Sequence, residues 1–348
     1  MPKVTIIGTT SWGLTLGIIL ARKGTKGSVW ARTEQEAAQL MDGQANFTNG
    51  FTLPPNLSVT SSLEKALSQS EAVILAVPSQ SVRQNTKLIA SHITRSMLVI
   101  SAAKGIEIAS GKRMSQVIAE EIKPEFQSNI CVLSGPNLSR EVLEGLPAAT
   151  VVAAEDKAIV RRAQKLFATP EFCVFINSDV VGVELGSSLK NIIALGAGIT
   201  DGLSYGDNAK AALITRGLTE MTAFGVALGA NPLTFSGLTG LGDLIATCAS
   251  PLSRNRYVGE ELAKGRPLKE ITEGMNGVAE GVSTTAAVWK LARQMDLEMP
   301  ITETIYRVLY KGADIRQSAA KLMEAGAVHE LAGRKWKLFS ALRVRRRS

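Results

Sequence analysis

The stretch VTIIGTTSWGLTLGIIL, residues 4–20, consists of a short apolar strand pattern, a turn containing glycine, and an apolar helix pattern. A strand, a tight turn and a helix in this order begin a dinucleotide-binding unit, whose turn has the pattern G-x-G-x-x-G. Gly8 and Gly13 occupy its outer positions, and Thr10 occupies the middle one. We expect helix N-terminal amides to face a pyrophosphate here, in a slightly altered turn. Because the Thr10 side chain stands where backbone approaches phosphate, we expect it to weaken that contact.

The rest of the first half alternates short β-branched runs with helix-like segments, which predicts a mostly parallel sheet covered by helices on both faces. After about residue 177 the strand patterns stop, and helical patterns continue to about residue 330. We therefore predict an α/β protein with a doubly wound sheet domain over residues 1–178, an all-helical domain over 179–333 and a basic tail over 334–348. The predicted strands are residues 3–7, 28–31, 72–78, 97–102, 129–135, 148–154 and 172–176.

The formal net charge of +8 would suggest a nucleic-acid-binding protein if it were spread over a domain. Residues 334–348 hold seven basic side chains and no acidic one, which leaves +1 for the rest of the chain. We therefore expect no nucleic-acid partner. The tail is predicted to be a solvated segment, with weak electrostatic contact to an anionic membrane as the alternative.

Composition also bears on the compartment. The apolar stretches are interrupted before the ~18 residues that a membrane span needs, and no secretory signal pattern opens the chain. Cys131, Cys173 and Cys248 are widely spaced in apolar sequence, which predicts buried free thiols in a reducing compartment. Short-spaced cysteine and histidine pairs are absent, so we expect no metal site. The sequence predicts a cytoplasmic protein.

Three predicted strands end in polar groups. Arg32 ends the segment VWAR, where a guanidinium suits the 2′-phosphate of NADPH, although a solvated arginine fits equally well. Lys104 follows the strand 97–102, and Gly135 and Asn137 follow the strand 129–135. Ligands of open α/β sheets bind outside the carboxyl ends of the strands. We expect these residues at a ligand site, with solvated strand ends as the alternative.

Two segments of the helical half carry further candidates. The predicted helix 180–199 places Lys190 and Asn191 on a polar face that borders a cleft, and a lysine so placed can transfer a proton to a carbonyl oxygen. An exposed helix lysine is the alternative. In residues 234–259, two glycine-rich turns lead to Asp243, and the cluster SRN follows. At a helix start this cluster offers amides and a guanidinium to an anion, which predicts a small phosphorylated substrate.

With these motifs in order, the sequence resembles the NAD(P)-dependent glycerol-3-phosphate dehydrogenase family over about residues 3–325. The resemblance implies a Rossmann-type domain followed by a helical domain like that of 6-phosphogluconate dehydrogenase. It also implies a homodimer that reversibly converts dihydroxyacetone phosphate to sn-glycerol 3-phosphate with NADPH or NADH, for glycerophospholipid synthesis. The segments that carry it are VTIIG with SWG, SAAKGIE, LSGPN, VELGSSLKNIIALGAGITDGL, NAKAALITRGLTEM, FSGLTGLGDLIATCASPLSRNR and NGVAEGVSTT.

The resemblance also implies roles for single residues. Lys190 is expected to give and take the proton at the substrate C2 oxygen, while Lys104 and Asp243 orient that end of the substrate. Arg32 favours NADPH over NADH. The expected substrate contacts are Lys104, Gly135, Asn137, Lys190, Asp243, Ser253, Arg254 and Asn255. The expected cofactor contacts are Gly8, Ser11, Trp12, Gly13, Arg32, Lys104, Ser139, Arg254, Val278 and Glu280.

Thr10 is the departure from this family, which usually has glycine at that position. Two alternatives therefore accompany the prediction. One is a related dehydrogenase of another small hydroxy compound, against which the SRN cluster and the block around Asp243 argue. The other is a non-catalytic NADPH-binding relative, which Thr10 and the basic tail suggest and the otherwise complete set of residues disfavours.

Overall fold

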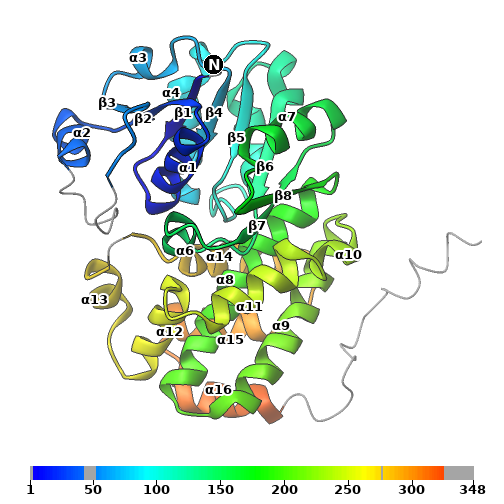
Figure 1. The fold of residues 1–348 in the computed structure, drawn as a ribbon. Coiled ribbons are helices and arrows are strands. Elements are labelled where there is room, and N and C mark those ends of the chain that lie inside the picture. Colours follow the sequence, from blue (N-terminus) through cyan, green and yellow to red (C-terminus); the bar gives the residue numbers. More distant parts are fainter. Residues whose placement is uncertain (1–2, 43–51, 276, 325–348) are drawn as a thin grey trace, which may run out of the picture. The chain divides into compact units, whose positions relative to one another are not determined.

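The computed structural model describes residues 3–42, 52–275 and 277–324, and the basic tail lies outside them. The chain divides into two compact units (Figure 1). The sheet unit comprises Met1–Glu107 and Lys112–Glu184. The helical unit comprises Ile108–Gly111 and Leu185–Ser348.

The sheet unit contains an eight-stranded sheet in the order β3-β2-β1-β4-β5-β6-β7-β8. All neighbouring strands are parallel except β6 and β7, which are antiparallel. The first six strands follow the order 3-2-1-4-5-6 of a Rossmann fold, which confirms the predicted fold class. The strands are β1 Lys3–Ile7, β2 Lys26–Trp30, β3 Leu57–Thr60, β4 Ala72–Leu75, β5 Leu98–Ser101, β6 Ile130–Ser134, β7 Ala148–Ala153 and β8 Phe172–Asn177.

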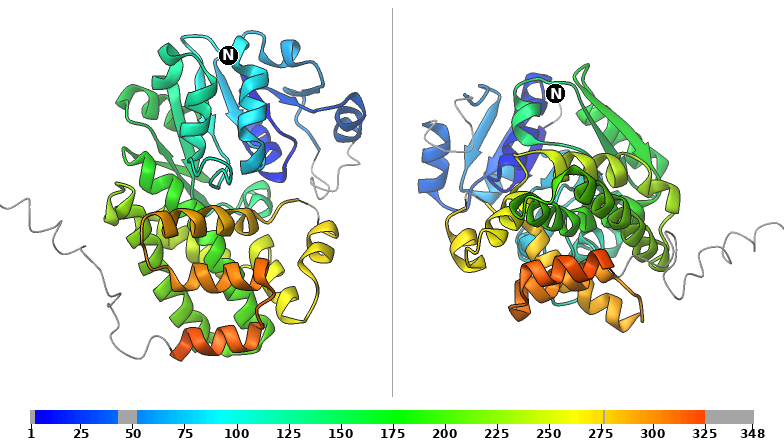
Figure 2. Two further views of the ribbon diagram at one scale, coloured as in Figure 1. Left: turned by 180° about the vertical axis from the view of Figure 1, so that it is seen from behind. Right: turned by 90° about the horizontal axis from the view of Figure 1, so that it is seen from below.

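Both faces of this sheet are covered because both sets of alternating side chains along its strands are apolar. Ile6 and Ile74 belong to one buried cluster, and Ile7 and Leu75 belong to another. Figures 1 and 2 show opposite faces of the sheet. The first cluster includes residues of α1 (Ser11–Arg22), α2 (Glu34–Met41), α6 (Ser139–Leu143) and α7 (Lys157–Phe167); the second includes residues of α3 (Leu63–Leu67), α4 (Val82–Ile89) and α5 (Met114–Glu121).

The sequence pattern missed β3. Its four residues, LSVT, are too short and too polar to stand out as an apolar run, and their pairing with β2 makes them a strand. The thiols also differ from expectation. Cys131 and Cys248 are buried, and burial raises the pKa of each to about 12, but Cys173 is exposed. It lies on β8, the last strand of the sheet, whose alternate residues point outward.

The helical unit is built on α8 (Val180–Gly202), which begins in the sheet unit. α8 is long and apolar enough to cross a membrane, and 89% of its most apolar window is buried inside the protein. Its predicted polar face is buried as well, Lys190 and Asn191 included. The other helices are α9 (Gly206–Ala227), α10 (Pro232–Phe235), α11 (Asp243–Ala249), α12 (Arg254–Ala263), α13 (Leu268–Glu273), α14 (Glu280–Gln294), α15 (Pro300–Lys311) and α16 (Ile315–Glu324).

Glycine lets α8 and α12 touch backbone to backbone. A Cβ atom on Gly259 of α12 would lie 1.9 Å from the carbonyl oxygen of Leu195, and one on Gly198 of α8 would lie 1.9 Å from that of Arg256. This close crossing brings the start of α12 beside α8, where Asn255 Nδ2 donates to Asn191 Oδ1 over 2.9 Å. The crossing therefore sets the position of the SRN cluster relative to Lys190.

We expect Gly259→Ala to lower the free energy of unfolding by about 3 kcal/mol, because overpacking against a backbone carbonyl forces the helices apart. Urea unfolding followed by circular dichroism measures the change. Gly274→Ala is the matched control, since its Cβ would meet Glu270 O at an ordinary 3.4 Å. Equal stability of the two variants would show that the crossing tolerates a side chain.

Candidate functional site

The turn after β1 lies where the strand order reverses, between β1 and β4. Gly8 has φ +113°, a conformation that side chains disfavour, and a Cβ there would lie 2.8 Å from Ala76 O. Glycine is therefore required at this position. In open α/β sheets such a switch point, outside the carboxyl ends of the strands, is where ligands bind.

Thr10 holds this turn in place. Its φ of −64° is unstrained, its hydroxyl donates to Ala76 O at 2.6 Å, and it accepts from Gly13 N at 3.1 Å as the N-cap of α1. The hydroxyl thus ties the turn to the end of β4 and satisfies one of the free amides of the helix start. The expected weakening of the phosphate contact by Thr10 stays a prediction, while the Thr10 hydroxyl stabilises the turn itself.

The start of α1 fits a dinucleotide. Its first turn carries no acidic residue, so the positive end of the helix dipole is available to a pyrophosphate. Trp12 Nε1 is buried and has no hydrogen-bond partner among the described residues, which makes it a donor for a ligand. Ser11 opens the helix, and Gly13 packs so tightly that a Cβ would lie 2.5 Å from Gly8 O.

Three further predicted residues meet at the same edge of the sheet. Lys104, beyond β5, donates from Nζ to Gly135 O, beyond β6, over 2.8 Å. Asn137 donates from Nδ2 to Ala149 O over 2.9 Å, while its Oδ1 is buried without a partner in the described part of the chain. Lys104 and Asn137 thus lie together at strand ends as predicted. Two residues predicted to contact the cofactor also follow strands of the sheet. Arg32 is exposed just beyond β2, and Ser139, the first residue of α6, follows β6.

The helical unit holds the other set, centred on Lys190. Lys190 is 5% exposed, and its Nζ donates to Asp243 Oδ1 and to Thr247 Oγ1, both at 2.5 Å. Asp243 is the first residue of α11 and follows a π-helical turn, Leu238–Gly242, formed by the predicted glycine-rich segment. The lysine predicted as proton donor is therefore a buried cation with two fixed oxygen partners.

Thr247 is a site residue that the sequence did not suggest. Its hydroxyl donates to the carbonyl of Asp243 at 2.6 Å and lies 3.2 Å from the Asp243 carboxylate. A threonine inside an apolar helix commonly bonds the carbonyl four residues earlier, so it does not stand out. Its spacing of four residues from Asp243, on one face of α11, was the available signal.

The SRN cluster begins α12 as predicted. Ser253 is the N-cap and accepts from Arg256 N at 3.2 Å. Arg254 is exposed, and its Nη1 donates to Val278 O over 3.3 Å, which brings two predicted cofactor residues together. Asn255 is buried, and its Oδ1 accepts from the backbone N of Gly281, the residue after Glu280, at 2.8 Å. An exposed guanidinium at a helix start can receive an anion.

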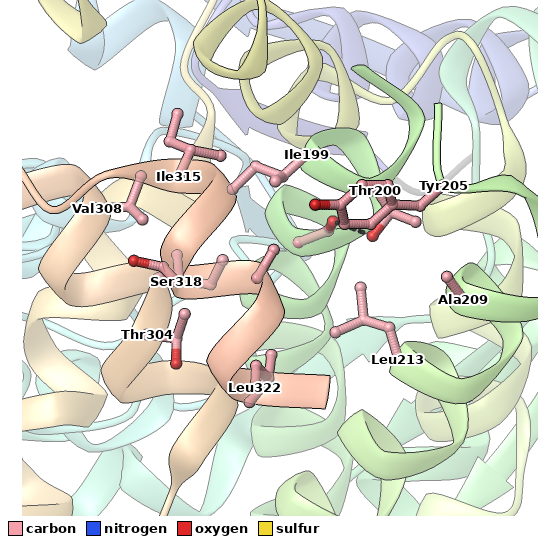
Figure 3. Close-up of a pocket in the computed structure, with 13 residues that line it drawn as sticks. Ile199, Thr200, Tyr205, Ala209, Leu213, Thr304, Val308, Ile315, Ser318 and Leu322 are labelled. Carbon is pink, nitrogen blue, oxygen red and sulfur yellow. Dashed lines mark hydrogen bonds between the residues drawn. The ribbon is translucent and has the colours of Figure 1, made fainter. Parts of the chain in front are cut away.

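An apolar cavity of about 50 Å³ lies elsewhere in the helical unit (Figure 3). None of the predicted site residues lines it, and its volume is far below the roughly 300–1,000 Å³ of a typical small-molecule site. The residues around it come from α8, α9, α15 and α16 and include Ile199, Leu213, Val308, Ile315 and Leu322.

Comparisons with known proteins agree with this geometry. The profile described as NAD-dependent glycerol-3-phosphate dehydrogenase N-terminus matches residues 3–160, and that of the C-terminus matches residues 179–320. A glycerol-3-phosphate dehydrogenase [NAD(P)+] of Dehalococcoides mccartyi is 61% identical over 99% of this chain and 97% of its own. One from Chlorobium limicola is 44% identical over 92% and 97%. The solved glycerol-3-phosphate dehydrogenase of Coxiella burnetii superposes with a TM-score of 0.88 at 32% identity, over 93% of this chain and 99% of its own.

We expect Thr10→Gly to lower the free energy of unfolding by about 1–2 kcal/mol, because the helix loses its cap and the turn loses its bond to Ala76 O. NADH should also bind more weakly, since the amides of the turn are held less firmly. Urea unfolding and calorimetric titration measure the two effects. Thr10→Ser, which keeps the hydroxyl, should match the wild type. Tighter NADH binding by Thr10→Gly would contradict this account.

Proposed function

The chain belongs to the NAD-dependent glycerol-3-phosphate dehydrogenase family, and from this premise we propose how its residues interconvert dihydroxyacetone phosphate and sn-glycerol 3-phosphate with NAD(P)H. The observation that carries the assignment is the buried ammonium of Lys190, held by Asp243 and Thr247. A buried charge with fixed partners in an enzyme is a candidate for acid–base chemistry.

Lys190 is the proposed proton donor and acceptor at the C2 oxygen of the substrate. In reduction it gives a proton to the oxygen as the carbonyl carbon is attacked; in oxidation it takes the proton back. Asp243 and Thr247 accept hydrogen bonds from Nζ and so fix its position for the proposed proton transfer. When bound, the reduced nicotinamide supplies the hydride that the carbonyl carbon receives.

Two further groups bind and orient the substrate in this proposal. Arg254 and the amides at the start of α12 receive the phosphate, with Ser253 and Asn255 beside them. Lys104 and Asn137, with Gly135, bind the hydroxyl and carbonyl end, where the ammonium of Lys104 favours a developing negative charge. Binding energy at the phosphate is remote from the reacting carbon and serves to orient it.

The proposed cofactor site is the turn from Gly8 to Gly13, with Ser11 and Trp12. The amides at the start of α1 bind the pyrophosphate, and Nε1 of Trp12, which has no partner in the described part of the chain, supplies one more donor. Arg32, Lys104 and Ser139 are the other proposed contacts in the sheet unit, and Arg254, Val278 and Glu280 are those in the helical unit. The phosphate-binding character of the SRN cluster favours a phosphorylated substrate over another small hydroxy compound.

Three broader properties are part of the proposal. The enzyme is proposed to act in the cytoplasm as a homodimer and to supply glycerol phosphate for glycerophospholipid synthesis. Residues 334–348, with seven basic side chains, are proposed to attach weakly to anionic membrane surfaces. This attachment would place the product near the enzymes that acylate it.

We expect Lys190→Arg to lower kcat about a thousandfold with NADH binding retained, because a guanidinium keeps the charge beside Asp243 but does not release a proton at neutral pH. Absorbance at 340 nm with dihydroxyacetone phosphate measures turnover. Lys210→Arg is the matched control, since Lys210 of α9 is also a lysine paired with an aspartate, Asp201 of α8, at 2.6 Å. If Lys190→Arg kept a tenth of wild-type kcat, the lysine would have only a structural role.

Deletion of residues 334–348 should leave kcat unchanged and abolish co-sedimentation with vesicles of anionic phospholipid at low salt, because each basic residue near the surface contributes roughly 1 kcal/mol to attachment. Vesicles of neutral lipid are the control. An intact chain that does not sediment with anionic vesicles even at low salt would rule out the membrane contact.

A further inference from the structure

Glu36, a carboxylate that the sequence did not single out, lies beside the proposed nucleotide site. It belongs to the first turn of α2. Its Oε2 accepts from the backbone N of Arg32, just beyond β2, over 2.8 Å, and its Oε1 accepts from the hydroxyl of Thr9, which follows Gly8. The carboxylate therefore joins the end of β2 to the turn after β1.

These two strand ends flank the position where a dinucleotide-binding fold holds the adenosine ribose. In such folds an acidic side chain at the end of the second strand accepts from the ribose 2′-hydroxyl, whereas an arginine there binds the 2′-phosphate of NADPH. In this chain the strand end itself carries Arg32, and the acidic group comes from Glu36, four residues later. Both kinds of group are therefore present at one strand end.

The partners of Glu36 leave room for a ribose. An ionised carboxylate has about four acceptor positions, and the Arg32 amide and the Thr9 hydroxyl use two of them. The side chain is partly exposed, so the remaining positions can accept from a ligand hydroxyl. A 2′-phosphate at the same place would carry negative charge against this carboxylate.

We propose that Glu36 determines how far this enzyme discriminates between NADH and NADPH. Its carboxylate accepts from the adenosine ribose of NADH and repels the 2′-phosphate of NADPH, and so opposes the preference for NADPH that Arg32 alone would give. The inference rests on the proposed cofactor site. It concerns only the nucleotide end of that site, so it can be tested by binding, independently of turnover.

A purely structural role for Glu36 predicts a different result. Thr33 is the N-cap of α2, and Glu36 is its third residue, a position where glutamate or glutamine often bonds backbone near the cap. If this were its whole role, Glu36→Gln would leave the Kd of every nucleotide unchanged or would raise all of them by the same factor. A change confined to nucleotides with a 2′-phosphate separates the two roles.

The test is Glu36→Gln, with calorimetric titration of NADPH, NADH, 2′,5′-ADP and 5′-AMP. We expect the Kd of NADPH and of 2′,5′-ADP to fall about tenfold relative to that of NADH and of 5′-AMP, as removal of one nearby like charge predicts. This gain should diminish at high salt because the repulsion is partly screened. Glu34→Gln, the same change at an exposed position in the first turn of α2, should leave the ratio unchanged.

Glu36→Ala also removes the charge and should give the same change of about tenfold in the ratio of Kd values, so it keeps the inference testable if Glu36→Gln is poorly folded. Thr9→Val removes the hydroxyl that holds Glu36 but leaves the charge, so the ratio of Kd values should stay within about twofold of wild type. Equal changes for NADPH and NADH in Glu36→Gln would overturn the inference and leave the proposed function intact. Failure of wild-type protein to bind any of the four nucleotides would overturn the cofactor site, and the inference with it.

Discussion

Burial of the Lys190 ammonium is the constraint around which the helical unit is arranged. An ammonium in the interior is costly unless an opposite charge and hydrogen bonds compensate it. Asp243 supplies the charge, and Thr247 supplies a second acceptor. The π-helical turn brings Asp243 to α8. When Lys190 gives up its proton in the proposed reaction, the Asp243 carboxylate still has the Thr247 hydroxyl 3.2 Å away.

In the sheet unit, the polar groups proposed to bind the pyrophosphate are backbone amides. Gly8 and the start of α1 present amides, and Thr10 fixes their position by bonding Ala76 O. With threonine in place of glycine, the backbone should approach the phosphate less closely, but the start of α1 gains an N-cap. Glu36 reaches the same turn from α2 through Thr9. The proposed nucleotide site is consequently held by one side chain within the glycine pattern, Thr10, and by one outside it, Glu36.

Sequence reasoning predicted the fold class and many of the residues that come together, because these depend on local signals. Runs such as AVIL predict strands, and Ser253 predicts a helix start. β3 and Thr247 depend on pairing and on packing between distant segments, which a local pattern does not contain. The antiparallel direction of β7 and the exposure of Cys173 have the same origin, since a strand's direction and outward face are set by its neighbours.

The distribution of charge along the chain bears on how an anionic substrate is bound. Since seven of the net eight positive charges lie in residues 334–348, the remaining chain is nearly neutral and creates little long-range field for an anionic substrate. In the proposed function, binding of a phosphorylated substrate therefore depends on local donors: the Arg254 guanidinium, the amides at the start of α12 and the Lys104 ammonium. The Lys190 charge is matched by Asp243, so it contributes little to attraction, and the proposed function assigns it proton transfer instead. Under the proposed function, substrate affinity and acid–base chemistry therefore belong to different cations, and substitutions should change one without the other.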